Sequence, residues 1–268
     1  VVDDTRGCFA ALTLWYGAAA VHLALTRPGP AGPGCPPAAV GRLLSNAFPL
    51  FVSSLLWTAY LTGNRWLCAY VSGGAALGYF SFAANIAFLF VGSVATICQI
   101  YYPEVSRRTL AGTLPRRRVL GELSVVAIGL GIAAATAELA VGPLMRQAFP
   151  TYFPAVDAVR LMLVSAAPLA LASWLLPLLL AVSRTPWTDC LAIFAGGFLL
   201  LAAGILCTAP AGLAWQAAGC LPGAVFVLGA CLVRLCRASV LCRATAAALS
   251  AAAMLGVVIA GGTALLSL

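Results

Sequence analysis

The chain has 268 residues, of which 63% are hydrophobic and 8% are charged, which is too little polar surface for a water-soluble globule. This composition indicates a polytopic membrane protein. A net charge of +8 would favour nucleic acid as the partner of a soluble domain. Here most basic residues lie near the ends of apolar segments, so we exclude nucleic acid and expect contacts with anionic membrane lipids.

Apolar stretches long enough to cross a bilayer recur along the chain. A transmembrane helix needs about 20 consecutive apolar residues. We predict eight spans, at residues 8–26, 43–61, 80–101, 123–142, 161–182, 190–208, 213–233 and 244–268. The predicted fold class is therefore all-α, a polytopic bundle of about eight transmembrane helices.

A segment rich in proline and glycine, residues 27–42, separates the first predicted span from the second. Its prolines oppose helix formation, so we predict a linker between two parts of the protein. The chain begins at Val1 without an initiator methionine or the basic region of a signal peptide, and we expect the protein to continue upstream.

The connection between the third and fourth spans, residues 102–118, sets the orientation. It holds five arginines, namely Arg107, Arg108, Arg116, Arg117 and Arg118. The positive-inside rule places it in the cytoplasm. Alternation of the spans then places residues 27–42, 183–187 and 234–243 on the same side, so the cytoplasmic connections hold eleven arginines and the outer side four.

A few polar side chains in and beside the spans are candidates for substrate binding. Asn46, Ser53 and Asn85 must face protein or water, so they could line a polar cavity or bond a neighbouring helix; we place Asn85 on an interior face. Arg42 and Arg65 flank the second span. Each could bind a phosphate or diphosphate through paired hydrogen bonds, or could simply anchor the topology.

Glu138 is the one acid inside a predicted span. An intramembrane carboxylate suggests an ion or proton relay, so Glu138 is our candidate for ion coupling. The alternative is a structural role about one turn from the outer interface, where Glu138 reaches the headgroups or pairs with Arg146.

Patterns for catalysis, cofactors and metals are absent from the sequence. The seven acids form no close pair beyond Asp3 and Asp4, and no G-x-S-x-G, Walker A or G-x-G-x-x-G motif occurs. The ten cysteines include no C-x-x-C pair, and the single histidine, His22, lies in an apolar span. We therefore expect no catalytic residue, no cofactor and no metal, and a protein that is not an enzyme.

Three further features predict structure rather than chemistry. Gly74 to Gly78 and Gly219 to Gly223 match G-x-x-x-G, which we interpret as helix packing. Asp157 and Arg160 have the spacing of an i,i+3 ion pair at a helix start. The aromatic and proline-bearing residues 149–154 suit a membrane–water interface.

Three stretches of the chain resemble one family. They are residues 44–50 with the aromatic and Gly-Asn-Arg end at 57–65, residues 77–83 running on to 102–107, and residues 144–155 leading to 161–163. In this order and spacing they resemble the polysaccharide flippases, of O-antigen and capsule type, in the multidrug, oligosaccharidyl-lipid and polysaccharide (MOP) exporter superfamily. The resemblance implies that residues 1–26 hold the last helix of an N-terminal lobe, residues 27–42 a cytoplasmic linker and residues 43–268 the C-terminal lobe.

The same resemblance implies a function. Such a protein flips a polyprenyl-diphosphate-linked oligosaccharide across the bacterial inner membrane by alternating access, driven by an ion gradient or the membrane potential. Arg42, Asn46, Asn85 and Arg65 would contact the diphosphate and sugars. Lipid-linked oligosaccharide, membrane lipids and polysaccharide polymerase machinery would be the partners. With one lobe outside the chain, we expect no transport by these residues alone.

Other functions stay open on the sequence. Within the same superfamily they are a lipid II flippase and a drug or cation antiporter, although an antiporter would favour more acids in the spans. From a different class, a polytopic membrane enzyme or subunit of envelope polysaccharide synthesis, such as a glycosyltransferase or acyltransferase, is the alternative. Acids and histidines clustered in the outer loops would favour that class.

Overall fold

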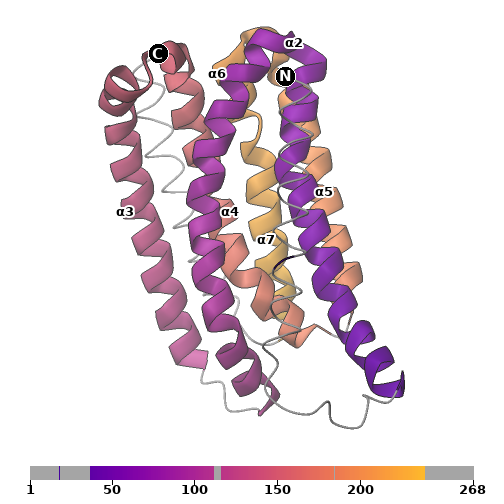
Figure 1. The fold of residues 1–268 in the computed structure, drawn as a ribbon. Helices are drawn as coiled ribbons and strands as arrows, with labels where there is room; N and C mark the ends of the chain where they lie inside the picture. The colour runs from indigo at the N-terminus through magenta and orange to yellow at the C-terminus, as the bar shows by residue number, and fades with distance from the viewer. Residues whose placement is uncertain (1–17, 19–36, 112–115, 184, 239–268) are drawn as a thin grey trace. The chain divides into compact units, whose positions relative to one another are not determined.

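The computed structural model describes residues 18, 37–111, 116–183 and 185–238. The described helices are α2 (Pro37–Leu110), α3 (Arg116–Ala148), α4 (Val156–Val182), α5 (Pro186–Thr208), α6 (Leu213–Ala218) and α7 (Leu221–Arg237), with the 3-10 turns η1 (Pro150–Ala155) and η2 (Ala209–Ala211). This part of the chain contains no strand, which confirms the all-α class (Figure 1). The chain divides into two compact units, Val1–Asn46 and Ala47–Leu268, and the helix bundle belongs to the second unit.

Helix α2 is a hairpin of two helical arms rather than one rod. Gly73 has φ +78° and ψ −177°, a backbone conformation that glycine adopts readily and other residues do not. A straight helix of 74 residues would measure about 110 Å. Instead, Arg65 and Asn85, which a continuous helix would hold about 30 Å apart, are joined by a hydrogen bond. We call residues 37–72 the first arm and residues 74–110 the second arm.

Two boundaries around the first arm differ from the sequence analysis. The helix begins at Pro37, so residues 37–42 of the predicted linker are helical; proline suits a first helical turn because its missing N–H has no partner there. The helix also continues past residue 61 to Ser72, since Trp66, Leu67 and Tyr70 keep this stretch apolar.

The described helices of this unit alternate in direction, so their connections gather at two ends (Figure 1). The turn of α2, η1 and η2 lie at one end, which we call the Gly73 end. The end of α2, the start of α3, the connection between α4 and α5 and the end of α7 lie at the other, which we call the Leu110 end. Contacts agree with this placement: Phe82 stacks on Tyr152 with ring centroids 4.3 Å apart at the Gly73 end. The described parts of the connections at 102–118, 183–187 and 234–243 lie at the same end, as the arginine pattern predicted. The cytoplasmic location of this end stays a prediction.

Five of the described helical segments are long and apolar enough to cross a membrane: Phe51–Ile100, Ser124–Ala148, Pro150–Val182, Pro186–Ala211 and Leu213–Arg237. The first segment overlaps two predicted spans, 43–61 and 80–101, and Gly73 separates them. The spans predicted at 8–26 and 244–268 lie outside the described residues, so the number of eight stays a prediction. Large apolar side chains face outward, as with Leu139 at 81% exposure, which is typical of contact with lipid. The chain is a multi-pass membrane protein.

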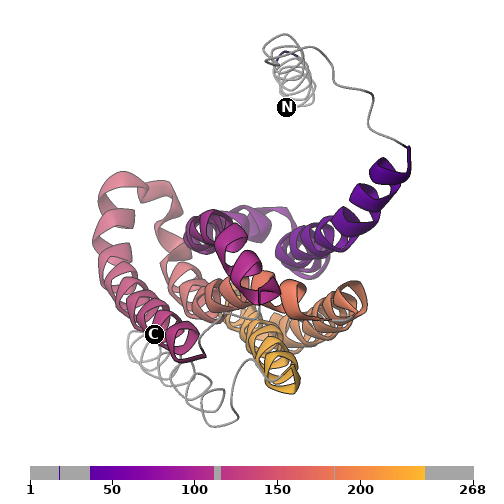
Figure 2. The ribbon, with the colours of Figure 1, turned by 90° about the horizontal axis from the view of Figure 1, so that it is seen from below.

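Helix α4 forms the core of the bundle. It contacts α3, α6 and α7, and most of its residues are buried, including Met162, Leu175 and Leu179. Seen along the helices, α4 lies among the others (Figure 2). At the start of α4, Arg160 Nη1 lies 3.7 Å from Asp157 Oδ1, which confirms the predicted pair.

Glycines let α5 cross α6 and α7 at backbone contact. A Cβ on Gly204 would lie 2.1 Å from the carbonyl oxygen of Gly219, and a Cβ on Gly223 would lie 2.7 Å from that of Gly197. Close helix approach of this kind is the use of small residues in membrane bundles. The packing interpretation of Gly219 to Gly223 is confirmed. It is wrong for Gly74 and Gly78, where a Cβ would meet nothing within 4 Å.

Candidate functional site

Arg65 in the first arm and Asn85 in the second arm meet across the hairpin. Arg65 Nη2 donates to Asn85 Oδ1 at 2.6 Å. The guanidinium carbon of Arg65 also lies 5.3 Å from the ring centroid of Phe88, which follows Asn85 by about one helical turn. The second arm therefore offers an amide oxygen and an aromatic face to the same cation.

The charge of Arg65 is not balanced by a carboxylate in this part of the chain. No described carboxylate lies within ion-pair distance of its guanidinium, and its Nε is buried without a hydrogen-bond partner. Arg65 precedes Gly73 by eight residues, about 12 Å along the arm, so it lies inside an apolar span. Its half-buried side chain keeps a positive charge and spare donors, which suits an anion.

The structure thus brings together two of the four predicted substrate-binding residues. Arg42 and Asn46 lie in the first arm, but their side chains fall outside those the structure describes. Asn85 is exposed, which corrects its predicted interior placement. The inward face of the second arm carries Ala83, Ala84 and Ala87, and Asn85 lies beside it, turned toward Arg65.

Glu138 lies on α3 and is buried, with 9% of its surface exposed. The predicted pairing with Arg146 finds no support, because the guanidinium of Arg146 lies over the ring of Phe153 at 5.2 Å. One turn after Glu138, Arg160 Nη2 lies 3.2 Å from the position of a Cβ on Gly142. A cation of α4 therefore packs against α3 close to Glu138.

A polar seam runs along one face of the first arm, and the sequence analysis missed it. It consists of Tyr60, Asn64, Cys68 and Ser72, at four-residue spacing. Gln216 of α6 bridges its outer part: Gln216 Nε2 donates to Ser72 Oγ at 2.5 Å, and Cys68 Sγ donates to Gln216 Oε1 at 3.5 Å. The i,i+4 repeat was the available signal, since such residues share one helix face.

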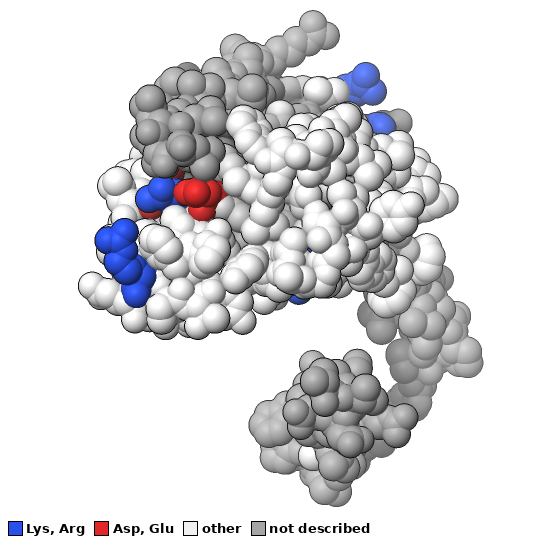
Figure 3. Space-filling model, turned by 90° about the horizontal axis from the view of Figure 1, so that it is seen from above, with Lys and Arg blue, Asp and Glu red and all other residues white. Residues whose placement is uncertain are grey.

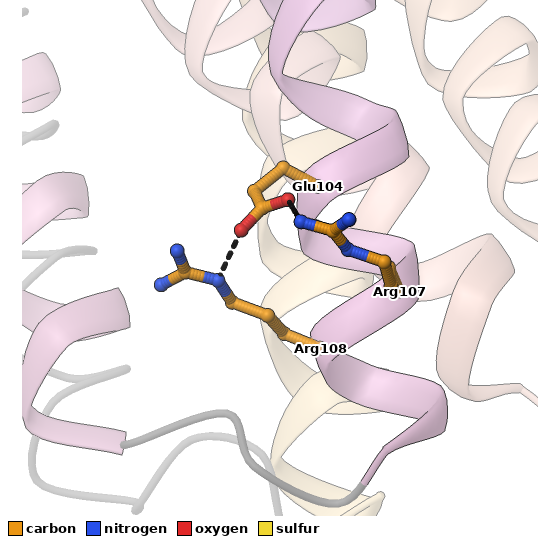
Figure 4. A network of polar contacts seen from close by, with 3 residues as sticks. All are labelled: Glu104, Arg107 and Arg108. Atoms are coloured by element: carbon orange, nitrogen blue, oxygen red, sulfur yellow. Dashed lines mark hydrogen bonds and ion pairs between the residues drawn. The ribbon is translucent and has the colours of Figure 1, made fainter.

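Two charged clusters occupy the Leu110 end. In the first, Glu104 accepts hydrogen bonds from Arg107 and from Arg108 Nε, the latter at 2.5 Å (Figure 4). The bond from Arg108 is the main cause that lowers the pKa of Glu104 below its ordinary value, and the charges of Arg107 and Arg108 lower it further. All three residues belong to the end of the second arm, so this part of the arginine-rich connection carries its own counter-charge.

The second cluster joins α5 to α7 and was not predicted. Asp189 accepts from Ser183 Oγ at 2.6 Å, and Arg234 Nη1 lies 2.7 Å from Asp189 Oδ1. Asp189 is buried, so pairing with Arg234 keeps its charge from being left uncompensated in the bundle. Asp189 and Arg234 neutralise each other, so we interpret this ion pair as stabilising the packing of α5 on α7.

Acidic and basic side chains occupy only small parts of the Gly73 end (Figure 3). Among the described residues, no three His, Cys, Asp or Glu side chains are grouped so as to hold a metal. The strongest candidate for ligand binding in this region is therefore the guanidinium of Arg65 with Asn85 and Phe88, an anion site rather than a metal site.

Comparison with protein families gives one match. Residues 10–108 match the family described as polysaccharide biosynthesis protein. No curated protein and no solved structure matched the chain. The matched segment contains Arg65, Asn85 and the first two of the three stretches that carry the resemblance, while the stretch at 144–155 lies outside it. Which half of a flippase the chain represents stays a prediction. Over residues 10–108 the chain is similar to the polysaccharide biosynthesis protein family, which confirms the predicted resemblance for that segment.

Proposed function

We propose that the protein flips a lipid-linked oligosaccharide, carried on polyprenyl diphosphate, across the bacterial inner membrane for polysaccharide export. The observation that carries this proposal is the family match over residues 10–108, which covers the hairpin with the Arg65 and Asn85 pair. A multi-pass helical bundle is the architecture that such transport needs.

In this proposal Arg65 binds the diphosphate of the carrier. Guanidinium groups bind phosphates through paired hydrogen bonds, and the side chain of Arg65 is only half-buried and has no carboxylate competitor among the described residues. Asn85 holds the guanidinium from one side through Oδ1, while its exposed amide can donate to a sugar hydroxyl. Arg42 and Asn46 remain candidate contacts by their position in the sequence.

Transport is proposed to be non-enzymatic and to use alternating access. An ion gradient or the membrane potential would drive it, with Glu138 as the candidate for ion coupling. The polysaccharide polymerase machinery would receive the flipped oligosaccharide. A lipid II flippase would use the same guanidinium on the same type of diphosphate.

The test uses the native protein in a strain blocked in export of lipid-linked glycan. Wild-type protein should restore surface polysaccharide, and Arg65→Ala should abolish it at equal membrane abundance. Arg146→Ala is the matched control, because Arg146 also lies over an aromatic ring but outside the matched family segment. Failure of the wild type to restore surface glycan, or full export by Arg65→Ala, would overturn the proposal.

A further inference from the structure

A small cavity lies inside the bundle, next to the inner part of the polar seam. It is enclosed by both arms of α2, by α4 and α5, and by the residue that precedes α7. Its lining includes Tyr60, Asn64, Phe88, Ser165 and Cys220. The cavity has room for about one water molecule.

Two residues that line this cavity each have a buried polar atom without a hydrogen-bond partner. These atoms are the hydroxyl oxygen of Tyr60 and Oδ1 of Asn64, in residues that are 2% and 3% exposed. Tyr60 and Asn64 are four residues apart on one helix, so both side chains lie on the same face and line the same space. Unsatisfied polar atoms are unfavourable inside a membrane protein, where no bulk solvent reaches them.

The backbone around Tyr60 fixes its hydroxyl in this position. A Cβ on Gly223 would lie 2.8 Å from the Tyr60 hydroxyl, and a Cβ on Gly197 would lie 3.3 Å from its ring. The ring also packs against Phe194, with centroids 6.3 Å apart. Because these glycines bring the backbone of α5 and α7 against Tyr60, its hydroxyl is held in position and cannot turn toward another partner.

The chemistry of the lining selects a neutral ligand that both donates and accepts. None of the described residues that line the cavity is charged, so an ion would be left without a counter-charge. Asn64 Oδ1 needs a donor and the Tyr60 hydroxyl proton needs an acceptor. Ser165 Oγ donates to the carbonyl oxygen of Met162 at 2.8 Å and retains acceptor capacity.

We propose that this cavity binds one ordered water molecule that bridges Tyr60 and Asn64. The water accepts from the Tyr60 hydroxyl, donates to Asn64 Oδ1 and can donate its second proton to Ser165, a number of bonds usual for buried water. The water site continues the polar seam, whose outer part is satisfied by Gln216 through Cys68 and Ser72. The first arm is thereby joined to α6 through Gln216 and to α4 through Ser165 by a seam of polar contacts, independently of any transported substrate.

The direct test is X-ray radiolysis of the whole protein in nanodiscs, read by mass spectrometry. Radiolysis forms hydroxyl radicals from water in place, so a buried side chain is modified quickly only beside an ordered water. Cys220 lines the cavity and Cys231 does not, although both thiols are buried, at 4% and 0% exposure. We expect Cys220 and Tyr60 to be modified several-fold faster than Cys231. Equal slow rates for all three would overturn the proposal.

The variant Asn64→Leu sharpens this test, because it replaces the acceptor with an apolar side chain of similar shape. Modification of Cys220 should fall to the rate of Cys231 in this variant, and an unchanged rate contradicts the proposal. If the variant does not fold, the comparison of Cys220 with Cys231 in the wild type still decides. Replacing sodium by choline should leave the Cys220 rate unchanged, since a dependence on sodium would mean that a cation occupies the cavity.

Discussion

Arg65 and Asn85 are twenty residues apart in the sequence and 2.6 Å apart in space, because Gly73 turns the second arm of α2 back beside the first. The contact places a guanidinium within an apolar span and gives it an amide partner instead of a carboxylate. A cation held in this way remains available to a phosphate, which a cation in an ion pair is not.

Replacing Asn85 with aspartate should separate folding from function. Asn85→Asp puts a carboxylate beside Arg65, so the new ion pair should preserve or raise the thermal unfolding temperature in detergent. The same carboxylate competes with a diphosphate, so surface polysaccharide should be lost. Asn85→Ala is the control: it loses one exposed hydrogen bond, at a cost of about 1 kcal/mol, and should retain part of the export. Full export by Asn85→Asp would contradict the assignment of Arg65 to the substrate.

Substitution of Gly73 should destabilise the hairpin through backbone strain alone. An alanine there would meet nothing within 4 Å, yet φ +78° with ψ −177° is a conformation for glycine only, at a cost of about 1–3 kcal/mol. Gly74→Ala is a matched control, because Gly74 also has open space but no positive φ. It should be neutral or stabilising by about 0.5–1 kcal/mol. If Gly74→Ala unfolds at a lower temperature than Gly73→Ala, residue 73 does not have the glycine-only backbone conformation that forms the hairpin turn.

Gly204→Ala should destabilise the bundle by steric overlap. Its Cβ would lie 2.1 Å from the carbonyl oxygen of Gly219, so α5 and α6 would have to separate, at a cost of about 1–3 kcal/mol. Gly229→Ala, in α7, meets nothing within 4 Å and serves as the control. Thermal unfolding temperatures of the two variants in the same detergent give the comparison. If both variants unfold at the wild-type temperature, α5 and α6 do not cross at backbone contact.

The carboxyl of Glu104 should titrate below the ordinary range of glutamate. Hydrogen bonding from Arg108 is the main cause of the lowered pKa, so Arg108→Gln should raise it more than Arg107→Gln does. A lowered pKa in the folded state means that the stabilisation by this cluster is present above the ordinary glutamate pKa and is lost as the pH falls through the folded pKa. Carbon-detected NMR of the Glu104 carboxyl measures the shift. Titration at the ordinary pKa in the wild type would show that Arg107 and Arg108 do not hold this carboxylate.

The sequence predicted the apolar elements well, because length and hydropathy alone define a membrane span. Residues 80–101 and 161–182 fall within the second arm and α4. The turn between the arms was predicted only as lying between the spans at 43–61 and 80–101, since Gly73 does not differ locally from the other glycines. Its positive φ is decided by the packing of the two arms, which no local pattern records.

The candidate site was predicted residue by residue but not as a group. Arg65 and Asn85 attracted attention because polar side chains are costly in a span, whereas their contact depends on the hairpin. Tyr60 and Asn64 were missed because neither is charged, and because the burial of Tyr60 depends on Gly197 of α5 and Gly223 of α7, which are distant in the sequence. Asp189 and Arg234 were missed because they come together only through packing of α5 on α7.

The most direct measurement of the central claim is flipping of a fluorescent polyprenyl-diphosphate oligosaccharide by the purified native protein in proteoliposomes. The account predicts movement of this carrier across the bilayer by the wild type and none by Arg65→Ala, while Arg146→Ala retains the wild-type rate. An oligosaccharide on a polyprenyl carrier without the diphosphate should not be moved. Equal movement with and without Arg65, or no movement by the wild type, would contradict the claim that this protein is a flippase acting through Arg65.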